Sequence, residues 1–174
     1  MNTSMSAKGE FAFGGKKSSI IFLKAVIMLI GIVALAWLIR FPQTEGRAAN
    51  LDLFSIYWDP IIIYMYVASI AFFVALFQAF KLFGYIGENK LFSLNSVRAL
   101  RIIKYCALAG VGFIVVGEVW IIIANMAQEV KDDAAGAIAM GIFTAFVSIV
   151  IAVATSVFEK SIRNILDEKN NPAA

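Results

Sequence analysis

One acidic residue interrupts a long apolar stretch of the chain and is the strongest candidate for chemistry. Glu118 lies eight residues before Met126, at the end of that stretch, which in a helix is a depth of ~12 Å. An ionisable group inside a membrane costs about 3 kcal/mol and usually faces other protein or a cavity. Glu118 could bind a cation or carry a proton, or a partner could hold its carboxyl and fix the helix register. We favour the structural role.

Polar residues in two other apolar stretches are candidate partners for that carboxyl. Tyr64 and Tyr66 lie early in the second stretch, at a comparable expected depth, and can donate hydrogen bonds. Arg40 lies at the outer end of the first stretch and could reach inward. Gln78 is a weaker candidate, for which an interhelical hydrogen bond is the simplest role.

A second group of candidates is basic and lies beside an apolar stretch. Arg98, Arg101 and Lys104 are spaced by three residues, so a helix would place them close to one face. Contact with phospholipid head groups is the simpler interpretation of such a face. Docking of a cytoplasmic partner is the more specific one.

Several reaction classes lack the residues that they need. The chain has no histidine and a single cysteine, Cys106, which excludes histidine-ligated metals and haem, histidine-dependent triads and an internal disulfide. Glycine-rich phosphate-binding motifs are also absent from the sequence. We therefore predict no catalytic residues, no metal or cofactor site, and no enzyme activity.

The candidate residues are positioned by four apolar stretches, which dominate a chain of 174 residues that is 61% hydrophobic. The stretches run from about 19 to 41, 60 to 83, 102 to 126 and 134 to 158. Each is long enough to cross a ~30 Å hydrocarbon core as a helix. The sequence therefore predicts an all-α integral membrane four-helix bundle over residues 19–158, with tails at 1–18 and 159–174.

Local signals predict where several helices begin. Asp59 is a good N-cap, and Pro60 suits the first helical position. Ser93 or Asn95 can cap a helix that continues into the third span. The connection 127–133 is short, which predicts that spans three and four are antiparallel neighbours. The segment 51–58 is aromatic at its end and is expected to lie along the outer interface.

The C-terminal segment has helical character of its own. Residues 159–169 look like a continuation of span four, with Ile162, Ile165 and Leu166 grouped on one side. This segment could extend the span, lie on the membrane surface or bind a partner.

Basic residues mark one side of the predicted membrane protein. Of the 15 lysines and arginines, only Arg40, Arg47 and Lys131 fall on the connections of the opposite side. The others are Lys8, Lys16, Lys17, Lys24, Lys81, Lys90, Arg98, Arg101, Lys104, Lys160, Arg163 and Lys169. By the positive-inside rule both termini are expected in the cytoplasm, with the protein spanning the cell inner membrane several times. The net charge of +3 then reflects topology, and we predict no direct contact with nucleic acid.

Small residues recur along the fourth span at steps of three and four. They are Ala137, Gly141, Thr144, Ser148, Ala152 and Thr155. Such stripes let membrane helices approach closely. The stripe could instead line a water-filled path, but helix packing is the interpretation that we favour.

The chain resembles a known family in its most patterned region. The segments are Gln78–Ile86, Phe92-Ser93 and the basic run Val97–Cys106. Together they resemble the uncharacterised bacterial four-span membrane protein family of the YoaS type, a domain of unknown function, and the likeness covers nearly the whole chain. Members are often encoded beside a small helix-turn-helix regulator, so the resemblance implies a membrane partner for a cytoplasmic transcription factor. It implies no catalytic residues. The tail Asp167–Pro172 keeps only the polarity of the family's usual ending.

Two hypotheses about function follow. The first is a membrane-embedded interaction or regulatory protein, whose basic cytoplasmic face meets a soluble regulatory protein or another copy of the chain. The alternative is a small transporter or channel component, forming a homo-oligomer, with Glu118 and the stripe of the fourth span along its path. We favour the first.

Overall fold

The computed structural model describes residues 4–44, 57–58, 60–126 and 134–170, and the regular secondary structure within these residues is helical. The long helices are α1 (Ser4–Thr44), α3 (Pro60–Gly87), α4 (Leu94–Met126) and α5 (Ala134–Asn170). Each described helix contains a segment that is long and apolar enough to cross a membrane, namely Ser18–Arg40, Pro60–Gly87, Leu94–Ile123 and Ile138–Asn170. The predicted all-α architecture with four candidate spans is confirmed.

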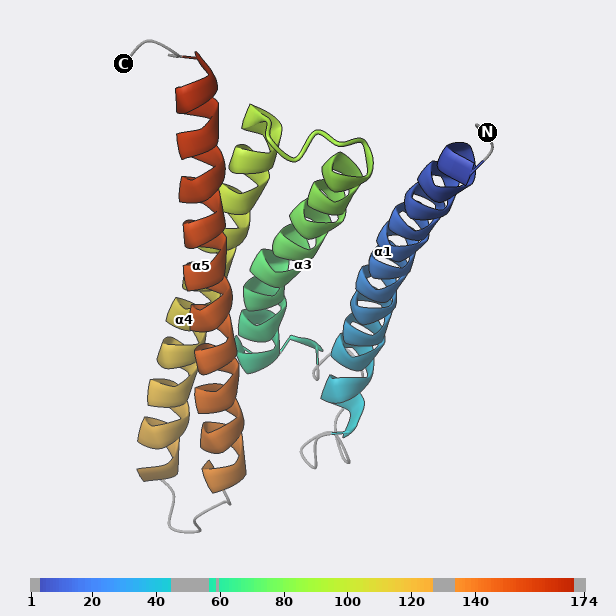
Figure 1. Cartoon of the computed structure of the whole chain (residues 1–174). Coiled ribbons are helices and arrows are strands. Elements are labelled where there is room, and N and C mark those ends of the chain that lie inside the picture. Colours follow the sequence, from blue (N-terminus) through green and yellow to red (C-terminus); the bar gives the residue numbers. More distant parts are fainter. Residues whose placement is uncertain (1–3, 45–56, 59, 127–133, 171–174) are drawn as a thin grey trace.

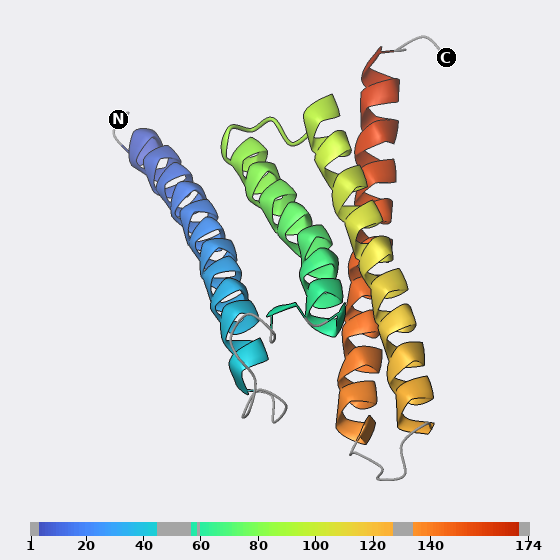
Figure 2. The same ribbon diagram turned by 180° about the vertical axis from the view of Figure 1, so that it is seen from behind.

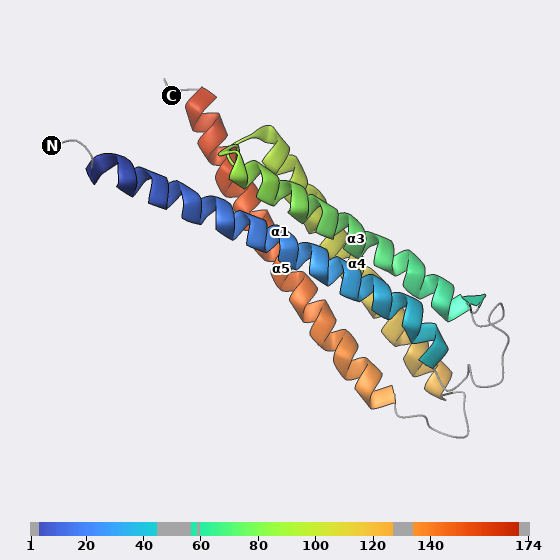
Figure 3. The ribbon, with the colours of Figure 1, turned by 90° about the vertical axis from the view of Figure 1, so that its right-hand side faces the viewer.

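The helices pack in chain order rather than around a common axis. α4 and α5 share the most extensive interface, α3 packs on α4, and α1 packs on α3. Figures 1 and 2 show the two faces of this arrangement, with α1 at the edge beside α3. The turn 88–93, the beginning of α1 and the end of α5 lie at the same end of the molecule (Figures 1 and 3). We call this end the turn end. α4 and α5 are antiparallel neighbours, as predicted.

The beginning of α4 is fixed by its cap. The Ser96 N–H donates to the Ser93 carbonyl at 3.1 Å and lies 3.4 Å from its Oγ, and the Val97 N–H donates to the same carbonyl at 3.2 Å. Ser93 is therefore the N-cap, and Asn95 lies inside the helix. Asn89, in the turn before it, has a φ of 56°, a left-handed conformation that asparagine tolerates better than most residues. α3 begins at Pro60 as predicted, whereas Asp59 lies outside the described residues.

Both terminal helices extend beyond the apolar stretches. α1 is helical from Ser4, so most of the predicted tail 1–18 belongs to the first helix. α5 runs without a break to Asn170, which confirms that the segment after residue 158 continues the fourth helix. Of the predicted interfacial segment 51–58, residues 51–56 lie outside the described part, and the Tyr57 hydroxyl lies 3.2 Å from the Ile39 carbonyl.

The tightest packing lies at the turn end, not in the middle of the spans. Val97, Leu100 and Ile162 are almost completely buried and contact one another. The half-buried leucines around them are Leu82, Leu91 and Leu166. Along the spans many large apolar side chains are exposed, for example Phe22 and Val116. This is the pattern expected when lipid, rather than protein, covers the outer faces of the helices.

Candidate functional site

A buried carboxylate with three basic partners joins α4 to α5 at the turn end. Glu159 on α5 keeps only 8% of its side chain exposed. Its Oε1 accepts from Arg101 Nε at 2.9 Å, and its Oε2 from Lys104 Nζ at 2.8 Å. A third cation, Arg163, approaches Oε1 at 3.4 Å. We call these four residues the Glu159 cluster.

Helix geometry explains why these side chains meet. Arg101 and Lys104 are three residues apart on α4, and Glu159 and Arg163 are four apart on α5, so each pair occupies one face of its helix. The apolar cluster lies beside these side chains, because Val97 and Ile162 are about one turn from Arg101 and Glu159 along their helices and Leu100 directly precedes Arg101. Three positive charges therefore surround one negative charge beside the driest part of the protein, and both carboxylate oxygens are used.

The Glu159 cluster includes only part of the basic face predicted from the sequence. Arg101 and Lys104 are ion-paired within the chain, whereas Arg98 is exposed and makes no ion pair with the residues that the structure describes. Sequence reasoning missed Glu159. The available signal was its position four residues before Arg163, a spacing that places an acid and a base on one face of a helix.

The second carboxyl between α4 and α5 has a different environment. Glu118 lies against Gly141 of α5, so closely that a Cβ at position 141 would overlap the carboxyl group. Its Oε2 is buried and has no hydrogen-bond partner within the described part of the chain. A glycine of the small-residue stripe thus makes room for the one acidic residue inside the third span.

The two tyrosines predicted as partners of Glu118 donate their hydrogen bonds to other groups. The Tyr64 hydroxyl donates to the Phe113 carbonyl, and the Tyr66 hydroxyl to the Leu38 carbonyl at 3.3 Å. The Tyr64 ring lies 3.5 Å from the Cβ position of Gly117, which is next to Glu118 in sequence but about 100° away around the helix. α4 therefore turns Gly117 toward α3 and Glu118 toward α5, so the predicted pairing with a tyrosine is not formed.

The remaining two polar candidates also stand apart from Glu118. Arg40 is exposed on α1, which packs on α3, and no ion pair joins it to Glu118. Gln78 is half-buried on α3 and makes no interhelical hydrogen bond with the described residues. The predicted set of intramembrane polar residues is therefore not one site.

Both threonine hydroxyls of the α5 stripe are hydrogen-bonded to their own helix. Thr144 Oγ1 donates to the Met140 carbonyl at 2.8 Å, and Thr155 Oγ1 to the Ile151 carbonyl at 2.7 Å. Ala152, in the same stripe, is buried. This geometry supports helix packing as the role of the stripe, because hydroxyls that bond their own backbone offer less to a water-filled path.

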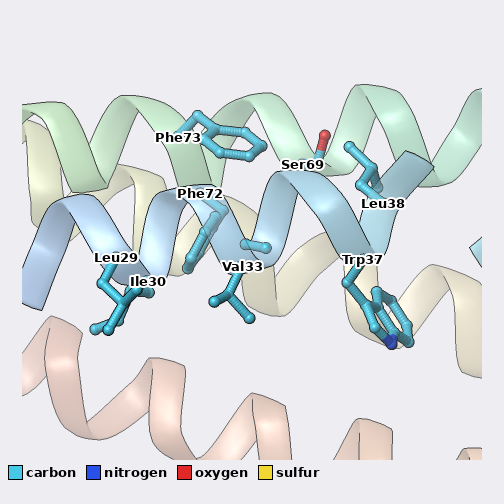
Figure 4. Close-up of a pocket in the computed structure, with 9 residues that line it drawn as sticks. Leu29, Ile30, Val33, Trp37, Leu38, Ser69, Phe72 and Phe73 are labelled. Atoms are coloured by element: carbon cyan, nitrogen blue, oxygen red, sulfur yellow. The ribbon is translucent and has the colours of Figure 1, made fainter. Parts of the chain in front are cut away.

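A pocket of about 510 Å³ lies on the flank between α1 and α3. Figure 4 shows Val33, Trp37 and Phe72 among its lining side chains. Its polar member, Ser69, already donates its hydroxyl to the Tyr66 carbonyl at 2.7 Å. Apart from the indole N–H of Trp37, the other lining side chains are apolar.

At the turn itself, Lys90 forms an exposed ion pair with Glu88 at 2.9 Å. The hydrogen bond and charge of Lys90 lower the pKa of Glu88 below its usual value. Elsewhere among the described residues, no group of three Cys, Asp or Glu side chains is arranged to hold a metal ion.

Comparisons with known proteins agree on a membrane protein of unknown activity. The model of DUF2975, described as a protein of unknown function, matches residues 42–171, which include α3, α4 and α5. The chain is 41% identical over 157 residues to the uncharacterized membrane protein YoaS of Bacillus subtilis (strain 168), covering 88% of this chain and 95% of that protein. No solved structure matches the chain.

Proposed function

The chain belongs to the DUF2975 family of proteins of unknown function, and we propose that it is an interaction or regulatory protein whose turn end meets a cytoplasmic partner. The resemblance to YoaS-type proteins seen in the sequence is confirmed by the comparisons. Neither the family nor the relative has a stated activity, so the proposal rests on the geometry of this chain.

The observation that carries the proposal is an ordered, basic surface built from two helices at the turn end. α5 continues past its apolar stretch to Asn170 and packs Ile162 and Leu166 against the beginning of α4. We call residues 94–104 and 159–170 the platform. The Glu159 cluster ties its two halves together, and Arg98, Lys160 and Lys169 remain exposed on it. A fixed, positively charged surface suits a soluble partner with an acidic face, because complementary charge guides association and orientation.

The proposal places both termini in the cytoplasm and the protein in the bacterial inner membrane. The positive-inside rule supports this orientation, since Lys90, Arg98 and Arg163 belong to the turn end while Arg40 belongs to the opposite end. Fusion of residue 174 to a fluorescent protein that folds only in the cytoplasm tests the orientation. Strong fluorescence is expected. Activity of a periplasm-dependent phosphatase fused at the same residue would contradict it.

Affinity capture from native membranes in mild detergent tests the partner. We expect a stoichiometric cytoplasmic protein to be captured with the native chain and lost with Arg98→Glu. Arg98 is the better choice than Arg101, because reversing Arg101 would also break the Glu159 cluster. Lys90→Gln is the control, since it removes another exposed cation at the same end, outside the platform, without placing a second carboxylate beside Glu88. Recovery of the chain alone, as a defined homo-oligomer, would contradict the proposal.

A specific observation favours a second candidate function, a small transporter or channel component. The buried Oε2 of Glu118 has no partner within the described residues, and an unpaired carboxyl inside a span is a typical ion or proton site. Glu118→Gln separates the two functions. Loss of a flux or growth phenotype with normal expression would support transport, whereas an unchanged phenotype would support the interaction proposal.

A further inference from the structure

The Glu159 cluster has more positive charge than its carboxylate can neutralise. Glu159 compensates one of its three cations, which leaves a surplus of two charges. The side chains of Arg101 and Arg163 are 45% and 50% exposed. Arg101 uses only Nε toward Glu159, and Arg163 only one terminal nitrogen. A guanidinium has five N–H donors, so both arginines keep donors on their exposed sides.

These donors lie at one end of an exposed apolar track. Arg101, Tyr105 and Leu108 follow one another at steps of four and three residues, and so share one face of α4. Tyr105 is 61% exposed and Leu108 is 49% exposed. The Lys104 ammonium lies 5.4 Å from the centre of the Tyr105 ring. A cationic site is thus followed, toward the middle of the membrane, by apolar side chains that are not covered by protein.

We propose that the exposed side of the Glu159 cluster binds the phosphate of an anionic phospholipid, whose acyl chain lies over Tyr105 and Leu108. Arginine forks match phosphate oxygens bidentately. A phospholipid matches this surface along its length. Its phosphate would lie at the arginines, and its acyl chain would lie beside the apolar span. An acidic peptide would match the charge but not the apolar track, so the observations favour lipid.

Glu159 is the positioning residue of this lipid site. Its buried carboxylate holds Arg101 Nε at 2.9 Å and Lys104 Nζ at 2.8 Å, which limits the rotamers that these long side chains adopt before a ligand arrives. A site organised in advance loses less conformational entropy on binding. The inference concerns a ligand different from the proposed soluble partner and does not depend on that partner.

Lipid retention by the purified full-length protein tests the proposal. The protein is delipidated in detergent, mixed with phosphatidylglycerol and phosphatidylcholine of equal chain length, and analysed by native mass spectrometry. We expect retention of phosphatidylglycerol to exceed that of phosphatidylcholine by about tenfold. Both lipids offer the same phosphate, but phosphatidylcholine also brings a choline cation, which the surplus positive charge of the cluster repels. Arg163→Gln should remove most of this preference, and Lys90→Gln should leave it unchanged.

Arg163 is the chosen position because its loss leaves Arg101 and Lys104 on Glu159, and circular dichroism checks that the helices persist. Equal retention of the two lipids, or a native preference in Arg163→Gln, would overturn the proposal. So would displacement of phosphatidylglycerol by millimolar inorganic phosphate or by a deca-glutamate peptide, which would indicate a site for a soluble anion or a protein. The assay contains no cytoplasmic protein. Its result can therefore be interpreted even if the proposed soluble partner does not exist.

Discussion

The interface between α4 and α5 contains two carboxyl groups in opposite environments. At the turn end, Glu159 is surrounded by Arg101, Lys104 and Arg163. Farther along the same interface, Glu118 lies against Gly141, and its Oε2 has no partner among the described residues. The α4–α5 interface therefore accommodates one carboxyl by pairing it with basic side chains and the other by placing it against a glycine backbone.

The difference follows from what each depth of the membrane permits. Near a helix end, long basic side chains can reach a carboxylate while their heads remain near water. Deep in the span a cation would be costly, and Gly141 provides space instead of a donor. The comparison predicts that removing the carboxylate affects stability strongly at Glu159 and weakly at Glu118.

Glu159→Gln is expected to have the largest effect. The substitution removes the buried counter-charge of the half-exposed Arg101 and of Lys104, which is 22% exposed. Because two cations lose their partner at once, the expected cost is about 3 kcal/mol, the lower end of the range for breaking a buried pair. The measurement is unfolding of the purified protein by SDS titration in mixed micelles. Glu88→Gln is the control, because Glu88 is an exposed acid at the same end. Equal stability of Glu159→Gln and the native protein would show that the cluster does not tie the helices together.

Gly141→Ala should have the next largest effect. The new Cβ would overlap the Glu118 carboxyl, which is the far end of a flexible side chain and can shift. The expected cost is therefore about 1 kcal/mol, at the lower end of the range for overpacking. Gly136→Ala, on the same helix, meets nothing within 4 Å and should be neutral or stabilising.

Combining Gly141→Ala with Glu118→Ala should recover most of the loss, because the second substitution removes the obstructing side chain. A double-mutant cycle in SDS titration gives the coupling energy of the two positions. Additive effects would contradict the contact between Glu118 and Gly141.

Arg163→Gln is expected to cost only about 0.5 kcal/mol, the value for a half-exposed ion pair one helical turn apart. The same SDS titration measures this change. A loss comparable to that of Glu159→Gln would mean that Arg163 contributes as much as Arg101 and Lys104, contrary to its longer distance of 3.4 Å.

Glu118→Gln should have the smallest effect on stability, below about 0.5 kcal/mol. The substitution keeps the shape of the side chain and removes no hydrogen bond of Oε2, which has no partner in the described structure. The prediction is checked on protein in lipid nanodiscs, by thermal unfolding beside Glu159→Gln. A large loss would indicate that the carboxyl acquires a partner in the membrane and would remove the contrast between the two sites.

Local features of the structure were predictable because their causes are local. Pro60 predicted the beginning of α3, and Ser93 was one of two predicted caps for α4. The continuation of α5 was predictable from the helical spacing of its apolar residues. The helix from Ser4 was not predicted, because Gly14-Gly15 lowers helix propensity and the segment is not apolar enough to suggest a span.

The Glu159 cluster was not predictable in full because its members are distant in sequence. Glu159 is 58 residues from Arg101 and 55 from Lys104, and they meet only in the register that α4 and α5 adopt. The environment of Glu118 was not predictable either, because it depends on the rotation of α4 about its own axis. The sequence placed tyrosines at a suitable depth, but α4 presents Gly117 to α3 and Glu118 to α5.

α5 is one uninterrupted helix that takes part in both carboxyl sites. Its 37 residues form a rod of about 55 Å that contacts Glu118 through Gly141 and Arg101 through Glu159. Gly141 and Glu159 are 18 residues apart on this helix, about 27 Å along its axis, so one continuous element carries both sites.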